Sequence, residues 1–150
     1  MDYLFYTDVD MMAINTMGDE IIPERLMATA HPGFFKKGLG TPEKRQISRA
    51  YIGNHEQREY YICGGFQGGK SEDYVQAMEI MNGMIQDDYS KNIIPIYHDE
   101  SIWNRFYVTN KNVFKILSLS GLLLVLSCSG DDGSASANQN PPDNSVSSIS

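Results

Sequence analysis

The fold is decided by the stretch REYYICGGFQGGKSEDYVQAMEIMNGMIQDDYSK, residues 58–91. Its first six residues include two tyrosines and an isoleucine, which predicts a strand over 58–63. The glycines that follow predict a loop over 64–69, and the segment 71–91 predicts a helix. One face of that helix should be buried, because large apolar residues recur there at helical spacing: Tyr74, Met78, Met81 and Ile85.

Apolar runs on either side predict two more strands. YLFYTDVDM (3–11) predicts a buried strand that ends at two acids, and NIIPIYHDES (92–101) predicts a strand that runs into an acidic turn. GDEIIPERLMATAHP (18–32) predicts a short irregular connection, since Pro23 argues against a long helix. Strand, helix and strand in succession indicate an α/β fold with its functional site at the strand ends.

Composition excludes some classes of protein. The 150 residues fit one domain, and the net charge of −7 argues against nonspecific nucleic-acid binding and against attraction to anionic lipid. Cys63 and Cys128 are too far apart in the sequence to suggest zinc spacing or a disulfide framework.

The C-terminal part differs in character from the rest. Lys111 and Lys115 precede an apolar run, 116–126, which is followed by Ser127, Cys128 and a tract rich in Ser, Asn, Asp and Pro. A basic start, a short apolar run and a small-residue cleavage zone are typical of a secretory signal. The end of the run resembles a bacterial lipobox, in which the cysteine is lipidated, and it points to a bacterial source. The run is too short for a bilayer, which needs about 20 residues.

Two interpretations of this part follow. Either two unrelated coding segments are joined near residue 110, or a buried hydrophobic element precedes a disordered tail. We favour the first, with units at 1–110, 111–129 and 130–150, and expect the last unit to be disordered. A lipid-anchored surface protein, attached through Cys128 and associated with a membrane through 116–128, is therefore an alternative function.

The two acids after the first strand have two readings. If the strand continues through Val9, Asp8 and Asp10 project to the same face, which suits a hard cation. Otherwise they form an exposed turn.

The run GGFQGGKS (64–71) matches the phosphate-loop pattern G-x-x-x-x-G-K-[ST], and a predicted strand and helix flank it. A phosphate-loop nucleotide-binding protein is thus a further alternative. Glu72 and Asp73 argue against it, because they place negative charge where the phosphates would bind.

Five motifs taken together resemble glycosyltransferase family 6, the retaining α-1,3 galactosyl- and N-acetylgalactosaminyltransferases. They are FYTDVDM (5–11), HPGFF (31–35), SRAYI (48–52), YYICGGFQGG (60–69) and YHDES (97–101). The resemblance covers residues 2 to about 109. It implies a GT-A-type, Rossmann-like mixed sheet with flanking helices, a UDP-GalNAc or UDP-Gal donor, a galactoside acceptor with or without fucose, and Mn²⁺.

The resemblance also implies roles for residues. Asp8 and Asp10 would hold Mn²⁺ against the donor diphosphate, where the cation neutralises charge on the departing UDP. Glu100 would be the catalytic nucleophile or a stabiliser of the oxocarbenium ion, and Asp99 would bind the donor sugar.

Other implied contacts concern the two substrates. Cys63, Gly64 and Gly65 would select the donor, with the third-position glycine favouring GalNAc, although Cys63 departs from the residues usual at the first position. The implied acceptor contacts are His31, Thr41, Tyr97 and His98.

The family has a nucleotide-binding portion before its D-x-D motif. We therefore expect this chain to be a central catalytic fragment, incomplete on its N-terminal side, with an unpaired sheet edge and little or no turnover alone. Its location would be the bacterial cytoplasm or membrane in a bacterium, and the Golgi membrane in a eukaryote.

Overall fold

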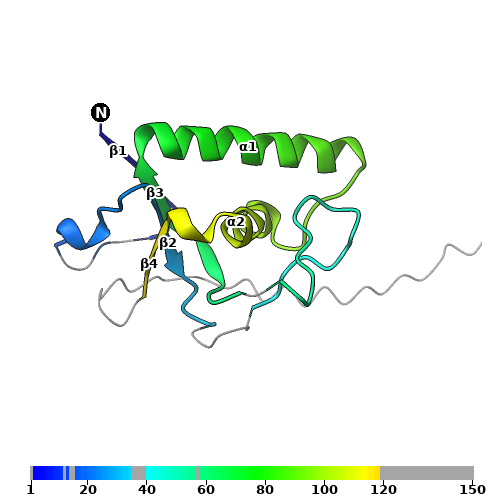
Figure 1. Cartoon of the computed structure of the whole chain (residues 1–150), viewed down its shortest axis with the longest axis horizontal. Helices are drawn as coiled ribbons and strands as arrows, with labels where there is room; N and C mark the ends of the chain where they lie inside the picture. The colour runs from blue at the N-terminus through cyan, green and yellow to red at the C-terminus, as the bar shows by residue number, and fades with distance from the viewer. Residues whose placement is uncertain (1, 12, 14–15, 35–39, 57, 119–150) are drawn as a thin grey trace, which may run out of the picture.

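The computed structural model describes residues 2–11, 13, 16–34, 40–56 and 58–118. These residues form a four-stranded mixed sheet and two long helices (Figure 1). The strand order is β1 (Tyr3–Thr7), β3 (Ile62–Lys70), β2 (Leu26–Ala30) and β4 (Phe114–Leu117). β3 is antiparallel to both of its neighbours, whereas β4 runs parallel to β2. The predicted α/β class, a mixed sheet with flanking helices, is confirmed.

The glycine-rich segment lies inside the central strand, so the predicted loop over 64–69 is wrong. A Cβ added at Gly68 would collide with the backbone of β1, and one added at Gly69 would collide with the backbone at Arg25. The absent side chains therefore let both neighbouring chains approach β3 closely. The same finding overturns the phosphate-loop alternative, because the segment pairs with β1 and β2 as a ladder and forms no open loop.

The other strand predictions had different outcomes. The strand predicted over 3–11 is present as β1, but it ends at Thr7 and none of its residues is buried, because it lies at the edge of the sheet. The predicted strand over 58–63 contributes only Ile62 and Cys63 to β3. The supposed irregular connection, 18–32, contains the 3₁₀ helix η1 (Asp19–Ile21) and the whole of β2. The segment 92–101 forms no strand: its first part is loop, and α2 (His98–Thr109) begins within the acidic motif.

The helix predicted over 71–91 is confirmed as α1 (Ser71–Ser90). Of its predicted apolar face, Tyr74 and Met81 are buried and Met78 is partly buried, whereas Ile85 is 40% exposed. Figure 1 shows α1 running across the top of the view, with the strands below its left-hand end and α2 seen nearly end-on beneath α1. The core between the sheet and these helices includes Leu26, Ala28, Ile62, Tyr74, Ala77, Met81, Ile102, Trp103, Phe106 and Tyr107.

Strand β4 brings the start of the C-terminal segment into the sheet. It follows the 3₁₀ helix η2 (Lys111–Val113), and Phe114 lies edge-on to Trp103 and Tyr107 at ring-centroid distances of 5.1 and 5.5 Å. Residues 119–150, which include Cys128 and the predicted disordered tail, lie outside the described residues. Within the described part of the chain, no helix has the length and apolarity needed to cross a membrane.

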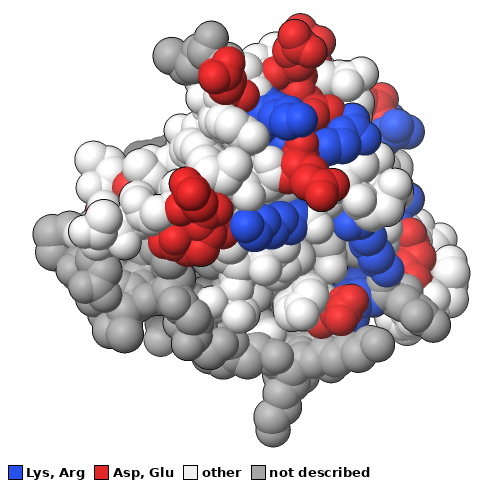
Figure 2. Space-filling view, turned by 60° about the vertical axis from the view of Figure 1, so that its left-hand side comes forward, with Lys and Arg blue, Asp and Glu red and all other residues white. Residues whose placement is uncertain are grey.

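Surface charges of opposite sign are interspersed. Figure 2 shows acidic and basic side chains next to one another on the face that it presents. Ion pairs of this kind join Arg25 to Asp73 at 2.5 Å and Lys91 to Asp87 at 2.7 Å. Exposed pairs such as these contribute little to stability.

Candidate functional site

Three elements meet at one end of the sheet. The backbone N–H of Asp8, just after β1, donates to the carbonyl of Gly65 in β3 at 2.9 Å. The N–H of Gly64 donates to Glu100 Oε2, in the first turn of α2, at 3.0 Å. The D-x-D motif, the C-G-G segment and the H-D-E-S motif are therefore neighbours in space.

The two acids of the D-x-D motif occupy a turn. β1 ends at Thr7, and the N–H of Met11 donates to the carbonyl of Asp8 at 3.1 Å. The strand therefore does not continue through Val9, and the strand-based reason for placing both acids on one face is wrong. Asp8 is half-buried, whereas Asp10 is exposed.

Tyr6 lies among three carboxylates at this point. Its hydroxyl donates to Asp8 Oδ1 at 2.5 Å. This hydrogen bond, followed by burial and by the charges of Asp8, Asp99 and Asp10, raises the pKa of Tyr6 to about 12. Asp99 of α2 is therefore near enough for its charge to act on Tyr6.

Asp8 and Asp10 are the two carboxylates of this turn. Among the described residues, no group of three or more His, Cys, Asp or Glu side chains could hold a metal ion. Two carboxylates are nevertheless a donor set that suits a hard cation which takes its remaining ligands from substrate phosphates and water. The residues present fit such a shared site and not a closed protein cage.

The first turn of α2 holds Glu100 in a fixed position. The side chain of Asn104, which is 1% exposed, donates to the carbonyls of Ile62 and Glu100 at 2.8 and 2.9 Å. Its Oδ1 accepts from the N–H of Ile62 at 3.0 Å. Asn104 thus ties the backbone of Glu100 to β3, while Gly64 holds the Glu100 carboxylate.

His31 and Tyr61 lie next to Glu100. The N–H of His31 donates to the carbonyl of Tyr61 at 2.8 Å, and the two rings are 5.8 Å apart. Burial, followed by the charge of Glu100, raises the pKa of Tyr61. Burial also lowers the pKa of His31, against the opposing effect of the Glu100 carboxylate. The His31 Nδ1 accepts from the N–H of Gly33 at 3.0 Å, which leaves Nε2 as the other ring nitrogen for a ligand.

The remaining predicted residues differ in accessibility. Cys63 is 2% exposed and pairs with Thr29 of β2, so its side chain faces protein. Tyr97 is 46% exposed and immediately precedes α2, and His98 is exposed with a φ of 44°. Thr41 is exposed and lies outside the contacts that join Asp8, Gly64, Gly65, Asp99, Glu100 and His31.

Three residues at this site were missed in the sequence: Tyr6, Tyr61 and Asn104. Tyr6 had a usable signal, because it stands two residues before Asp8 at the end of a predicted strand. Asn104 had a weaker one, because it stands four residues after Glu100 and so shares its helical face. Tyr61 had none beyond its place in a family-like motif.

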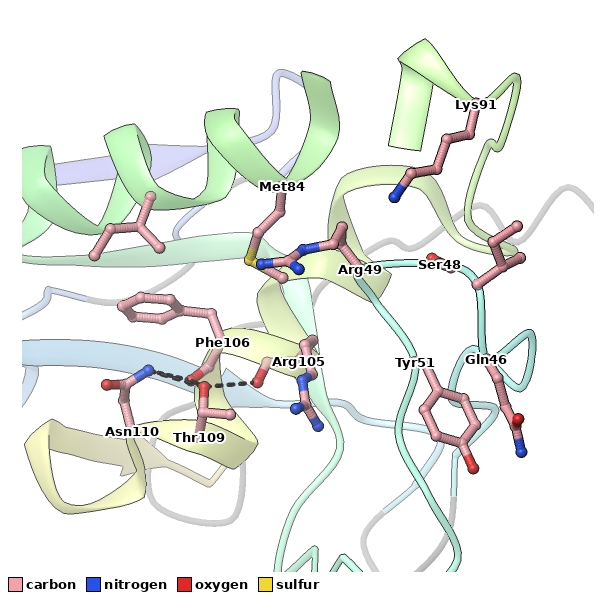
Figure 3. Close-up of a pocket in the computed structure, with 12 residues that line it drawn as sticks. Gln46, Ser48, Arg49, Tyr51, Met84, Lys91, Arg105, Phe106, Thr109 and Asn110 are labelled. Carbon is pink, nitrogen blue, oxygen red and sulfur yellow. Dashed lines mark hydrogen bonds between the residues drawn. The ribbon is translucent and has the colours of Figure 1, made fainter. Parts of the chain in front are cut away.

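An open cleft lies elsewhere and is not lined by any predicted site residue. It has a volume of about 600 Å³ and lies between the loop 46–51, α1 and α2 (Figure 3). Its cations are already paired: Arg49 and Lys91 both contact Asp87, and Arg105 contacts Glu56. Cleft size alone therefore does not identify the functional site here.

Acids and a glycine segment are thus gathered at one end of the strands of an α/β sheet, which is where such sheets commonly bind ligands. The model of glycosyltransferase family 6 matches residues 1–122 of the chain. The chain belongs to glycosyltransferase family 6.

Several curated proteins are similar over most of this chain. Rat histo-blood group ABO system transferase 1 is 34% identical over 120 residues, which cover 79% of this chain and 34% of the relative. Mouse globoside alpha-1,3-N-acetylgalactosaminyltransferase 1 is 31% identical over 113 residues, which cover 74% and 32%. The Escherichia coli O-antigen biosynthesis glycosyltransferase WbnI is 30% identical over 112 residues, which cover 73% and 47%. The chain thus spans about a third of the length of the rat and mouse relatives.

Proposed function

We propose that this chain carries the donor-sugar end of a retaining hexosyltransferase site. The reaction would transfer GalNAc or Gal from a UDP-sugar, in α-1,3 linkage, to a galactoside acceptor. Family membership supports the reaction class. The observation that carries the proposal is the junction of Asp8, Gly64, Gly65 and Glu100 through two hydrogen bonds of 2.9 and 3.0 Å.

Each residue of the proposed site would have its own role in binding or catalysis. Asp8 and Asp10 would hold a divalent cation such as Mn²⁺, which when bound neutralises charge on the UDP leaving group. Asp99 would bind donor hydroxyls. Glu100, whose carboxylate is held by Gly64 and whose backbone is held by Asn104, would face the sugar carbon as nucleophile or stabiliser of positive charge. His31, Tyr97 and His98 would contact the acceptor, with Thr41 as a more distant candidate. The buried state of Cys63 favours a role for it in shaping the Gly64–Gly65 backbone.

The test combines donor binding with turnover by the full chain. We expect UDP-GalNAc or UDP-Gal to bind in ligand-observed NMR only when Mn²⁺ is present. We also expect slow transfer of the sugar to a fucosylated galactoside. The transfer should be slow because the chain spans only about a third of the length of the rat relative. Glu100→Gln should lower turnover by about 100-fold or more while donor binding stays, since the amide cannot supply the negative charge.

Glu79→Gln, at an exposed position of α1, is the matched control and should leave both measurements unchanged. Failure of both donors to bind in the presence of Mn²⁺ would refute the proposal. Turnover that Glu100→Gln does not alter would refute the role of Glu100.

A further inference from the structure

Tyr6 makes the hydrogen bond that fixes the side chain of the first D-x-D acid. We infer that Tyr6 is a positioning residue, which holds Asp8 Oδ1 so that Oδ2 is the oxygen presented to a divalent cation. The inference rests on the proposed function, because it concerns how the proposed metal ligand is oriented. It starts from the 2.5 Å bond between the Tyr6 hydroxyl and Asp8 Oδ1.

The backbone explains why these two side chains meet. In β1, Tyr6 pairs with Gln67 and Thr7 pairs with Phe66. The bond from the Asp8 N–H to the Gly65 carbonyl, at 2.9 Å, extends this ladder by one residue beyond the strand. Residues two apart on such a ladder project to the same face, so the Tyr6 ring and the Asp8 carboxylate lie side by side.

The second oxygen of Asp8 has a different environment. A Cβ placed on Gly65 would stand 3.1 Å from Asp8 Oδ2, so this oxygen lies directly over the glycine backbone. With Oδ1 occupied by the tyrosine hydroxyl, the carboxylate has one oxygen left to offer. Single-oxygen coordination suits a cation that also takes oxygens from a diphosphate.

Asp10 does not lie on the extension of the β1–β3 ladder, as Asp8 does. The turn closed by the Met11 N–H and the Asp8 carbonyl, at 3.1 Å, takes Asp10 off the ladder, and Asp10 is exposed. Asp8 is therefore the preorganised ligand, and Asp10 joins it when a cation is present. Groups that orient a ligand in this way commonly change metal affinity 10–100-fold when they are removed.

The experiment uses Tyr6→Phe in the full chain, which removes only the hydroxyl of a residue that is 44% exposed. Mn²⁺ is titrated in the presence of UDP and followed by electron paramagnetic resonance. We expect Tyr6→Phe to weaken Mn²⁺ binding by about tenfold or more. The control is Tyr3→Phe on the same strand, where the ring stacks on Phe5 at 6.4 Å, and it should change the affinity less than twofold. Unchanged or tighter binding by Tyr6→Phe would overturn the inference.

A second measurement needs neither metal nor donor. NMR relaxation of the Asp8 side chain reports its order, which should fall in Tyr6→Phe and stay unchanged in Tyr3→Phe. If Asp8 is equally ordered in both variants, Tyr6 does not position it, whatever the chain binds. If the order falls but the wild-type chain binds no Mn²⁺ with UDP, the proposed metal function fails and the contact between Tyr6 and Asp8 stands.

Discussion

At the scale of single residues, Gly65 is the position where the D-x-D turn and the central strand come closest. A Cβ there would stand 2.6 Å from Met11 Sδ and 3.1 Å from Asp8 Oδ2. We predict that Gly65→Ala destabilises the chain modestly, by about 1 kcal/mol, because the flexible end of Met11 and the Asp8 carboxylate must move. It should also weaken Mn²⁺ binding, since the displaced atom is the proposed ligand. Urea unfolding and the Mn²⁺ titration measure the two effects.

The neighbouring glycine supplies the control. A Cβ at Gly64 would lie 3.7 Å from Glu100 Cβ, which is ordinary van der Waals contact. Gly64→Ala should therefore unfold close to the wild-type urea midpoint. Equal destabilisation by the two substitutions would mean that general strand packing, and not the approach of Asp8, requires glycine at 65.

The acids of the site could be predicted from the sequence, whereas their surroundings could not. Asp8, Asp99 and Glu100 stand in short local motifs, and the structure brings these motifs together. Their geometry depends on partners far along the chain: Glu100 is held by Gly64, and its backbone is tied by Asn104 to Ile62. Nothing in the local sequence around Glu100 specifies Gly64 or Ile62, which lie far away in the chain.

At the scale of elements, the failed strand predictions share a physical cause. The central strand contains four glycines, a composition depleted in strands, and here close approach by β1 and β2 outweighs intrinsic preference. The apolar run at 93–96 buries only Ile93 and Pro95, and it is held as a loop by backbone and side-chain contacts from elsewhere. α1 was predictable because its helical periodicity is long and local.

Glu43 is the side chain that holds this loop, and its ionisation should be visible in stability. Its carboxylate, in a residue that is 3% exposed, accepts from Arg45 Nη2 at 2.7 Å and from the Ile96 N–H at 2.9 Å. The bond from the Arg45 side chain is the main cause that lowers the pKa of Glu43 to about 2, against the opposing effect of burial.

Because the folded-state pKa lies below the ordinary value of 4.5, Glu43 stabilises the fold above about pH 4.5. That contribution, on the order of 2–3 kcal/mol, should be lost as the pH falls toward 2. We predict that Glu43→Gln lowers the free energy of unfolding at pH 7 and that the difference from wild type narrows in acid. Urea titrations between pH 2.5 and 7 measure this, with the exposed Glu24→Gln as control. A difference that is the same at every pH would contradict the ionic explanation.

At the scale of the whole molecule, the sequence composition and the structure differ on where the transferase-like part ends. The change of composition after residue 110 favoured a boundary there, yet β4 pairs with β2 and the family match continues to residue 122. A strand of four residues beside a lipobox-like sequence gives too short a pattern to reveal its partner. Phe114 links β4 to the core, since its ring packs edge-on against Trp103, Phe106 and Tyr107.

If β4 belongs to the same cooperative unit, removing that ring should destabilise the entire sheet. We predict that Phe114→Ala costs about 2 kcal/mol, because a large, partly buried side chain that packs against the core is lost. Fluorescence of Trp103, the only tryptophan, and far-ultraviolet circular dichroism should then shift to lower urea together. Lys115→Ala, at the exposed neighbouring position, should change either midpoint little. A Phe114→Ala chain that unfolds like the wild type would instead place the boundary near residue 110, because a separate segment contributes nothing to the stability of the sheet.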